Sequence, residues 1–163
     1  MNIVLLEPEI PQNTANIGRS CVVTRSALHL IEPLGFSISE KSVRRAGLDY
    51  WKDLDLRVYG GFGDFLRQNH NPEIFMATTK ARLSYDRARF KPDSFIMFGK
   101  ESAGIPEELL LRYRETAIRI PMAEGYRSLN LASSVAAVLY EALRQNGFPG
   151  LETAGELHRF EWE

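Results

Sequence analysis

The sequence predicts an α/β fold, in which a mainly parallel β-sheet is flanked by helices. Short apolar runs of strand length recur along the chain, and segments with helical periodicity separate them. Parallel strands need such crossovers, and a sheet covered on both faces keeps its strands apolar throughout. With 163 residues, 44% of them hydrophobic, and no break in composition, the chain predicts one domain over residues 1–150 and an acidic C-terminal tail over residues 151–163.

The first half of the chain opens with a strand, a rigid loop and a helix. Asn2–Leu6 is predicted to be a buried strand, and the proline-containing loop Glu7–Asn13 leads to a helix from about Thr14 to Ser26. Ala27–Ile31 supplies the next strand, which completes a βαβ unit. The next predicted elements are a short helix at Ser39–Ala46, a strand at Leu56–Tyr59, a helix around Asp64–Gln68 and a strand at Ile74–Thr79.

The C-terminal third combines two further strands with two helices. Ser94–Phe98 and Ala117–Ile120 are short apolar runs bounded by turn residues, which is typical of buried strands. Pro106–Arg114 predicts a helix with proline in its first turn. The last helix is predicted from apolar residues at i, i+4, i+7 and i+8, and Ser128 or Asn130 can cap it; these apolar residues are Leu131, Val135, Val138, Leu139, Ala142 and Leu143.

Two loops that follow these strands are the best candidates for a ligand site. The loop Phe98–Pro106 follows one strand, and the loop Ile120–Asn130 follows the other. Ligands of open α/β sheets bind beyond the carboxyl ends of the strands, where loops and helix N-termini present free N–H groups. For either loop taken alone, simple glycine turns and a helix cap are the favoured interpretation.

Composition and charge exclude several classes of protein. No apolar run approaches the roughly 20 residues needed to span a bilayer, and the N-terminus has neither a basic region nor a cleavage site. We therefore expect a cytoplasmic protein without a membrane association. Cys21 lies in an apolar run and is expected to be a packing residue. Because His29, His70 and His158 are isolated in the sequence, we expect no metal site.

The formal net charge of −1 means that any contact with nucleic acid must use a local basic patch. One cluster surrounds Tyr85 and Phe90, which are possible stacking groups, and a smaller one lies close to Tyr50 and Trp51. A solvated surface is about as probable for either cluster taken singly. The candidate RNA-binding residues are Arg44, Arg45, Lys52, Lys80, Arg82, Arg87 and Arg89.

Two nucleotide-binding motifs fail in detail. Gly60–Gly63 follows a strand, but a dinucleotide-binding register starting at Gly61 would need glycine at Leu66. Gly99–Ser102 lacks the first glycine of a phosphate loop and has Glu101 directly after the lysine. A nucleotide-dependent oxidoreductase is therefore disfavoured.

Three segments taken together are more specific than any one of them. Glu7–Arg19, Phe98–Pro106 and Ile120–Asn130 resemble, in order and spacing, the three motifs of the SPOUT class of RNA methyltransferases, the TrmH/SpoU superfamily. The resemblance extends from Asn2 to about Gly150 and is strongest to the short, single-domain group that methylates tRNA nucleotide 34. It implies a SPOUT fold with a C-terminal deep trefoil knot and a homodimer whose active site is shared by two chains.

The resemblance also implies a cofactor and its contacts. S-adenosyl-L-methionine would be the methyl donor and S-adenosyl-L-homocysteine the product, with no metal. The implied cofactor-binding residues are Ala77, Thr78, Gly99, Ile120, Met122, Ser128 and Leu129. Gly99 suits a close backbone approach, and apolar side chains at Ile120 and Met122 suit an adenine ring.

Four residues are implied to be catalytic, namely Asn13, Arg19, Glu101 and Asn130. An arginine does not readily lose its proton, so we expect Arg19 to stabilise the 2′-oxygen or the adjacent phosphate by its charge. Glu101 would orient Arg19 or a loop N–H, and Asn130 would fix the second or third loop. The alternatives are purely architectural roles for Glu101 and Asn130, and pairing of Arg19 with Glu7 or Glu9.

The implied function is 2′-O-methylation of the ribose at the tRNA wobble nucleotide 34, a cytidine or modified uridine, in leucine tRNAs. The partner would be the tRNA anticodon region. The alternatives are methylation of another tRNA or rRNA site, and a non-catalytic RNA-binding module that retains the fold.

Overall fold

The computed structural model describes residues 1–38 and 49–162, and within them one seven-stranded sheet organises the chain. The strand order is β3-β2-β1-β6-β4-β7-β5, and each neighbouring pair is parallel. The strands are β1 (Asn2–Leu6), β2 (Ala27–Ile31), β3 (Leu56–Tyr59), β4 (Ile74–Ala77), β5 (Leu83–Ser84), β6 (Phe95–Phe98) and β7 (Ala117–Arg119). The predicted parallel α/β architecture is confirmed.

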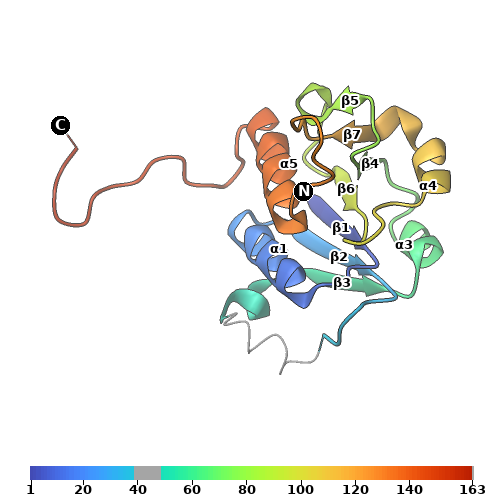
Figure 1. The fold of residues 1–163 in the computed structure, drawn as a ribbon. Helices are drawn as coiled ribbons and strands as arrows, with labels where there is room; N and C mark the ends of the chain where they lie inside the picture. Colours follow the sequence, from blue (N-terminus) through green and yellow to red (C-terminus); the bar gives the residue numbers. More distant parts are fainter. Residues whose placement is uncertain (39–48, 163) are drawn as a thin grey trace.

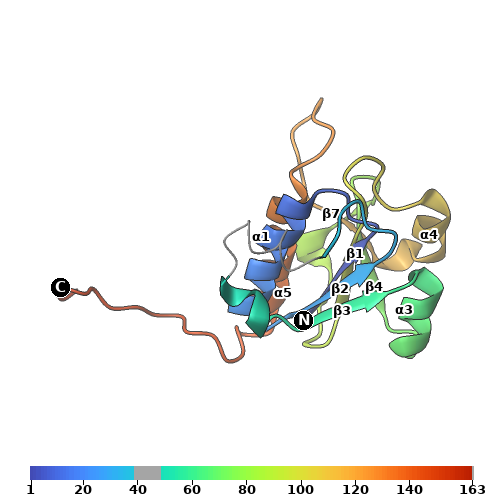
Figure 2. The same ribbon diagram turned by 90° about the horizontal axis from the view of Figure 1, so that it is seen from below.

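Helices cover both faces of this sheet (Figure 1). The pair α1 and α5 lies on one face, and α3 and α4 lie on the other, as the perpendicular view also shows (Figure 2). The α-helices are α1 (Pro11–Val23), α3 (Phe62–Gln68), α4 (Glu107–Arg112) and α5 (Leu131–Gln145). Short 3₁₀ helices occupy Asp49–Asp53, Tyr85–Arg87 and Arg114–Thr116.

The continuous apolar character of β1 follows from this burial on both faces. Successive side chains of a strand point to opposite faces. Ile3 and Leu5 therefore pack in the core beneath α1 and α5, while Val4 and Leu6 pack with Phe65 in the core beneath α3. All four strand residues are almost fully buried, so a polar residue at any of them would lack a partner.

Helix α1 is displaced toward the N-terminus relative to the prediction. It begins at Pro11 rather than Thr14, because proline at the first helical position loses no intrahelical hydrogen bond and already has a helical φ. It ends at Val23 rather than Ser26. Arg25 has a φ of 53°, a left-handed conformation that stops the helix.

Other boundaries differ by one or two residues, and one strand was missed. Strand β4 ends at Ala77 rather than Thr79, and β7 ends at Arg119. Strand β5, only two residues long, pairs with β7 at the edge of the sheet and is too short for a periodic signal. The predicted helix at Ser39–Ala46 lies outside the described residues.

The C-terminal segment leaves the body of the protein. Residues 151–162 form no helix or strand and extend away from α5 (Figure 1). Phe160 and Trp162 are 77% and 70% exposed, so these aromatic side chains add nothing to the core. Over the residues that the structure describes, no helix has both the length and the apolar character to cross a membrane.

Two buried polar groups lie away from the sheet's carboxyl edge. Cys21 is fully buried in the core beneath α1, which confirms its packing role, and burial raises the pKa of its thiol to about 12. His29 is buried between the Tyr59 hydroxyl, at 2.8 Å from Nδ1, and Asn2 Oδ1, at 3.2 Å from Nε2. Within the described chain, no three His, Cys, Asp or Glu side chains gather in a way that could hold a metal ion.

Candidate active site

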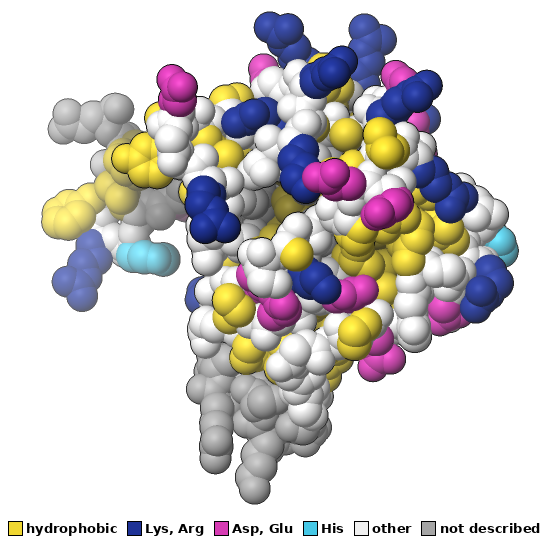
Figure 3. Space-filling view, turned by 45° about the vertical axis from the view of Figure 1, so that its right-hand side comes forward, with side chains coloured by type: hydrophobic (Ala, Val, Ile, Leu, Met, Phe, Trp, Pro, Cys, Tyr) yellow, Lys and Arg dark blue, Asp and Glu magenta, His cyan; other side chains and the backbone are white. Residues whose placement is uncertain are grey.

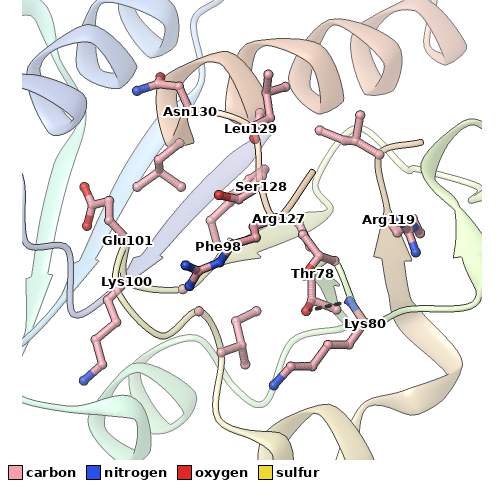
Figure 4. A pocket seen from close by; sticks show the side chains of 18 of the residues that line it. Thr78, Lys80, Phe98, Lys100, Glu101, Arg119, Arg127, Ser128, Leu129 and Asn130 are labelled. Carbon is pink, nitrogen blue, oxygen red and sulfur yellow. Dashed lines mark hydrogen bonds between the residues drawn. The ribbon is translucent and has the colours of Figure 1, made fainter. Parts of the chain in front are cut away.

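A cavity of about 590 Å³ lies at the carboxyl ends of β4, β6 and β7 (Figure 4). Its walls come from residues 77–80 after β4, residues 98–105 after β6, and the segment between β7 and the first turns of α5. Ile10 and Asn13 close it from the side of α1. The position is the one expected for a ligand site in a parallel sheet, and the volume is within the usual range for small-molecule pockets.

The structure brings the predicted cofactor-binding residues together around this cavity. Each of them lines it: Ala77, Thr78, Gly99, Ile120, Met122, Ser128 and Leu129. They come from three loops that are far apart in the sequence but lie at one edge of the sheet, because β4 is hydrogen-bonded to both β6 and β7. The cavity therefore combines apolar side chains with the backbone of three loops, a combination suited to an adenosine-containing ligand.

Gly99 shows why the wall after β6 needs glycine. A Cβ atom at this position would lie 2.1 Å from the carbonyl carbon of Gly104 and 2.3 Å from the amide nitrogen of Ile105. The loop folds back on itself, since the Gly104 amide donates to the Lys100 carbonyl over 2.8 Å. Any side chain at Gly99 would force the two halves of this loop apart.

Three of the four predicted catalytic residues form one hydrogen-bonded chain. Asn13 Nδ2 donates to Glu101 Oε1 over 2.9 Å, and Asn130 Nδ2 donates to Asn13 Oδ1 over 3.1 Å. Asn130 Oδ1 in turn accepts from the Ser133 amide, so Asn130 caps α5 as predicted. The chain of contacts joins all three motifs at the rim of the cavity.

Glu101 also fixes the loop before α1. Its Oε2 accepts from the Glu9 amide over 2.8 Å, and its Oε1 accepts from the Ile10 amide over 3.3 Å. Of the two roles predicted for Glu101, the structure shows the orientation of loop N–H groups. Contact with Arg19 is not observed among the described residues.

Two carboxylates of the loop before α1 also contact the loop after β6. Glu9 accepts hydrogen bonds from both the amide and the hydroxyl of Ser102, each over 2.8 Å, and these bonds lower the pKa of Glu9 below its usual value. Glu7 forms an ion pair with Lys100 over 2.8 Å. Both carboxylates therefore hold the loop after β6, and the alternative that one of them pairs with Arg19 is wrong for this chain.

Arg19 is exposed on α1 and is not among the described residues that line the cavity. Its guanidinium lies over the Tyr50 ring, 5.5 Å from the ring centroid. Its turn of α1 faces the 3₁₀ helix at Asp49–Asp53, since a Cβ at Gly18 would lie 3.1 Å from the Trp51 ring. A single chain therefore does not place Arg19 beside the other predicted catalytic residues.

The predicted RNA-binding residues divide into three groups. Lys80 lines the cavity, whereas Lys52, Arg82, Arg87 and Arg89 are exposed outside it, and Arg44 and Arg45 lie outside the described residues. Figure 3 shows Lys and Arg side chains around the hollow on one face of the molecule. Tyr85 lines the cavity and can meet a ligand there. Phe90 is buried against Phe75, with ring centroids 4.7 Å apart, so its predicted role as a stacking group is wrong.

Sequence reasoning missed several residues that line the cavity. The charged ones are Lys100, Arg119 and Arg127. Arg119 belongs to a short apolar strand, and Arg127 lies within the third motif directly before Ser128, so neither stands out in the sequence as a ligand contact. The available signal for Arg119 was its place at the carboxyl end of a predicted strand, where ligands of a parallel sheet bind.

The chain is similar to proteins of known name over nearly its full length. The tRNA (cytidine(34)-2′-O)-methyltransferase of Escherichia coli strain K12 is 42% identical over 151 residues, which cover 92% of this chain and 96% of that protein. A solved structure from work on the 2-OH methylation of C/U34 on tRNA superposes with a TM-score of 0.84 and 42% identity, over 90% of this chain and 95% of that one.

A more distant structure contains the expected cofactor. The AdoMet-bound rRNA methyltransferase from Sinorhizobium meliloti superposes with a TM-score of 0.77 and 25% identity. The match covers 88% of this chain and 55% of that one. The SpoU rRNA Methylase family matches residues 1–140, which include the sheet, the cavity and the first part of α5. The chain belongs to the SpoU rRNA methylase family.

Proposed function

We propose that the protein transfers a methyl group from S-adenosyl-L-methionine to the ribose 2′-hydroxyl of the tRNA wobble nucleotide 34, a cytidine or uridine. The observation that carries this proposal is the similarity to the Escherichia coli tRNA (cytidine(34)-2′-O)-methyltransferase, which extends over nearly the full length of both chains. The cavity supports it, because the residues that the resemblance assigns to the cofactor all line one site. Residues 1–150 would form the catalytic domain, with residues 151–163 as a tail.

The cavity fits an adenosine-containing methyl donor. Ile120, Met122 and Leu129 offer apolar contacts for the adenine ring, and the loop at Gly99 brings backbone close to the ligand. When bound, the donor supplies an activated methyl on a sulfonium. The protein then has to align the acceptor oxygen with this methyl and stabilise the charge that develops on the oxygen.

The hydrogen-bonded chain of Glu101, Asn13 and Asn130 would hold the three cavity loops in register. Both carboxylate oxygens of Glu101 accept hydrogen bonds from N–H groups, three in total, so we assign Glu101 a positioning role. Asn130 fixes the start of α5 and with it Ser128 and Leu129 at the cavity. A loss of this alignment would slow methyl transfer without removing any group that reacts.

Arg19 would act in the cavity of a second copy of the chain. Arg19 is exposed on α1. Val23, one turn further along the same helix, is 57% exposed, and Tyr140 on the adjacent α5 is 48% exposed. This exposed apolar surface on α1 and α5 supports a homodimer that buries it. Arg19 of one protomer would then stabilise the 2′-oxygen at the partner's cavity.

The tRNA anticodon region would contact the basic residues around the cavity. The residues that we assign to this contact are Lys52, Lys80, Arg82, Arg87 and Arg89, together with Arg44 and Arg45. We expect the substrates to be leucine tRNAs. Single-stranded anticodon bases can be splayed out and stacked on aromatic side chains, which suits Tyr50 and Trp51. Binding that rests on these cations should weaken as the salt concentration rises.

The test is transfer of labelled methyl to total tRNA that lacks wobble ribose methylation, followed by nucleoside mapping. We expect label at the 2′-oxygen of nucleotide 34, and loss of that label in Arg19→Ala. Because Arg19 does not line the cavity of its own chain, Arg19→Ala should bind S-adenosyl-L-homocysteine as the wild type does. Label at another position in tRNA, or no transfer to any tRNA, would disprove the proposed site.

A further inference from the structure

The cavity is lined by more positive charge than its own acidic groups neutralise. The cations that line it are Lys80, Lys100, Arg119 and Arg127. Two of them are held by carboxylates: Lys80 pairs with Glu107 over 2.6 Å, and Lys100 pairs with Glu7 over 2.8 Å. In the described part of the chain, neither of the two arginines has an ion-pair partner.

The one acid at the cavity does not compensate them. Among the described residues that line the cavity, Glu101 is the only carboxylic acid. Its two oxygens already accept from the amides of Glu9 and Ile10 and from Asn13. The guanidinium groups of Arg119 and Arg127 therefore face a site without a free carboxylate.

Arg127 is the better placed of the two to meet an incoming ligand. It belongs to the segment between β7 and α5, which projects from the body of the protein (Figure 2), and its side chain is exposed. Figure 4 shows this side chain directed into the cavity beside Phe98, with Arg119 on the far side of Thr78. Tyr126, the preceding residue, is 76% exposed, so its ring does not anchor the segment in the core.

A guanidinium covered by a ligand needs an anionic partner. Removing a charge from water without pairing it costs several kcal/mol, by order of magnitude, whereas arginine binds phosphate or carboxylate oxygens in a two-pronged geometry. The methyl donor of the proposed reaction carries a positive sulfonium, which adds to the charge at the cavity. An oxyanion carried by the ligand would supply the partner that the covered guanidinium needs.

We propose that Arg127, assisted by Arg119, binds the phosphodiester that follows the target ribose of the substrate RNA. This inference rests on the proposed function. In RNA the 3′-phosphodiester is attached to the carbon next to the one that carries the 2′-hydroxyl, so a cation that holds this phosphate also places the hydroxyl at the cavity. The projecting, exposed position of Arg127 favours RNA phosphate over the other available oxyanion, the carboxylate of the cofactor.

The test compares Arg127→Gln, Arg127→Lys and Arg119→Gln with Arg67→Gln, a matched control. Arg67 is an exposed arginine on α3 that pairs with Asp64 and does not line the cavity. Three quantities are measured for each: the Kd for S-adenosyl-L-homocysteine without RNA, the Kd for unmodified tRNA over a range of salt concentrations, and the single-turnover rate of methyl transfer.

For Arg127→Gln we expect an unchanged Kd for S-adenosyl-L-homocysteine, weaker binding of tRNA, and a salt slope smaller by about one, as for the loss of one phosphate contact. Methyl transfer should slow further. Arg127→Lys should recover part of the affinity because it keeps the charge but loses the two-pronged contact. Arg119→Gln should show a smaller loss, and Arg67→Gln should match the wild type.

Two results would overturn the inference. Weaker binding of S-adenosyl-L-homocysteine with unchanged binding of tRNA would assign Arg127 to the cofactor's carboxylate. Unchanged binding of both would leave it without a ligand role. A wild-type protein that binds tRNA and cofactor but transfers no methyl would overturn the proposed function alone, because the comparison of tRNA affinities between the variants would still decide the role of Arg127.

Discussion

Asn13 donates a hydrogen bond to Glu101 over 2.9 Å, although 88 positions separate the two residues in the sequence. Asn13 is only 7% exposed, and its carbonyl oxygen accepts from Asn130, so both ends of its side-chain amide are used. One small side chain thereby ties α1 to the loop after β6 and to the start of α5. Asn13 thereby links the three sequence motifs through its side chain.

Asn13→Ala should destabilise the protein by about 1–3 kcal/mol, since it leaves Asn130 without its acceptor and removes one donor from Glu101. Urea unfolding of the two proteins measures this difference. The matched control is Asn16→Ala, which changes an exposed residue of the same helix and should alter the free energy of unfolding by no more than about 0.5 kcal/mol. Equal effects of the two substitutions would contradict the role of the network.

Gly99→Ala should abolish cofactor binding because the new methyl group would lie 2.1 Å from the backbone of Gly104. The loop would have to open, and with it the wall of the cavity. Calorimetric titration with S-adenosyl-L-homocysteine measures the loss. Gly63→Ala is the control: a Cβ there meets only the end of Arg67 at 3.7 Å, and alanine favours the helix α3. Normal binding by Gly99→Ala would show that the loop adapts.

Glu9→Gln should weaken cofactor binding severalfold without unfolding the protein. The carboxylate of Glu9 accepts from both donors of Ser102, and an amide has one oxygen with which to replace these two contacts. The loop after β6 would then be held less firmly at the cavity. Ser102→Ala should produce part of the same loss, and the double variant should add little to Glu9→Gln. Fully additive effects would mean that the two residues act independently.

The central strands β1 and β2 could be predicted because they are buried on both faces, and their bounds agree with the sequence interpretation residue for residue. The bounds of β3 agree as well, although β3 is an edge strand with exposed side chains at Arg57 and Val58. Boundaries set by backbone geometry were less accessible. Helix α1 ends at a left-handed conformation of Arg25, whereas glycine is the residue that normally signals such a conformation in a sequence. The two-residue strand β5 depends on its pairing with β7.

The candidate site divides in the same way. The residues that the resemblance assigns to the cofactor do line the cavity, because the fold brings the loops at the ends of these strands together. The partners of Glu7 and Glu9 could not be predicted, because they depend on how the loop before α1 meets the loop after β6. Arg19 shows the limit of a motif: its spacing from Asn13 is fixed by the sequence, but the helix turns its side chain away from the cavity. The implied knot and homodimer stay predictions.

His29 should make the stability of the protein depend on pH between about pH 6.5 and 4. Burial lowers the pKa of His29 from 6.5 to about 4 in the folded protein, so the unfolded chain takes up the proton first as the pH falls. Because the unfolded state binds more protons in this window, the free energy of unfolding should fall by about 2 kcal/mol from pH 7 to pH 5.

Urea unfolding at the two pH values measures this change in free energy, and NMR titration of the His29 ring assigns it. Carboxylates such as Glu9 and Asp64, whose pKa values are lowered, also stabilise the folded protein. Their contribution is lost mainly as the pH falls below their ordinary pKa values near 4, which is below the interval from pH 7 to pH 5. Replacing the exposed His70 and His158 by glutamine provides the control and should leave the pH dependence unchanged. If that variant lost the dependence, or if the His29 ring titrated near pH 6.5 in the folded protein, burial of His29 would not be the source of the pH dependence.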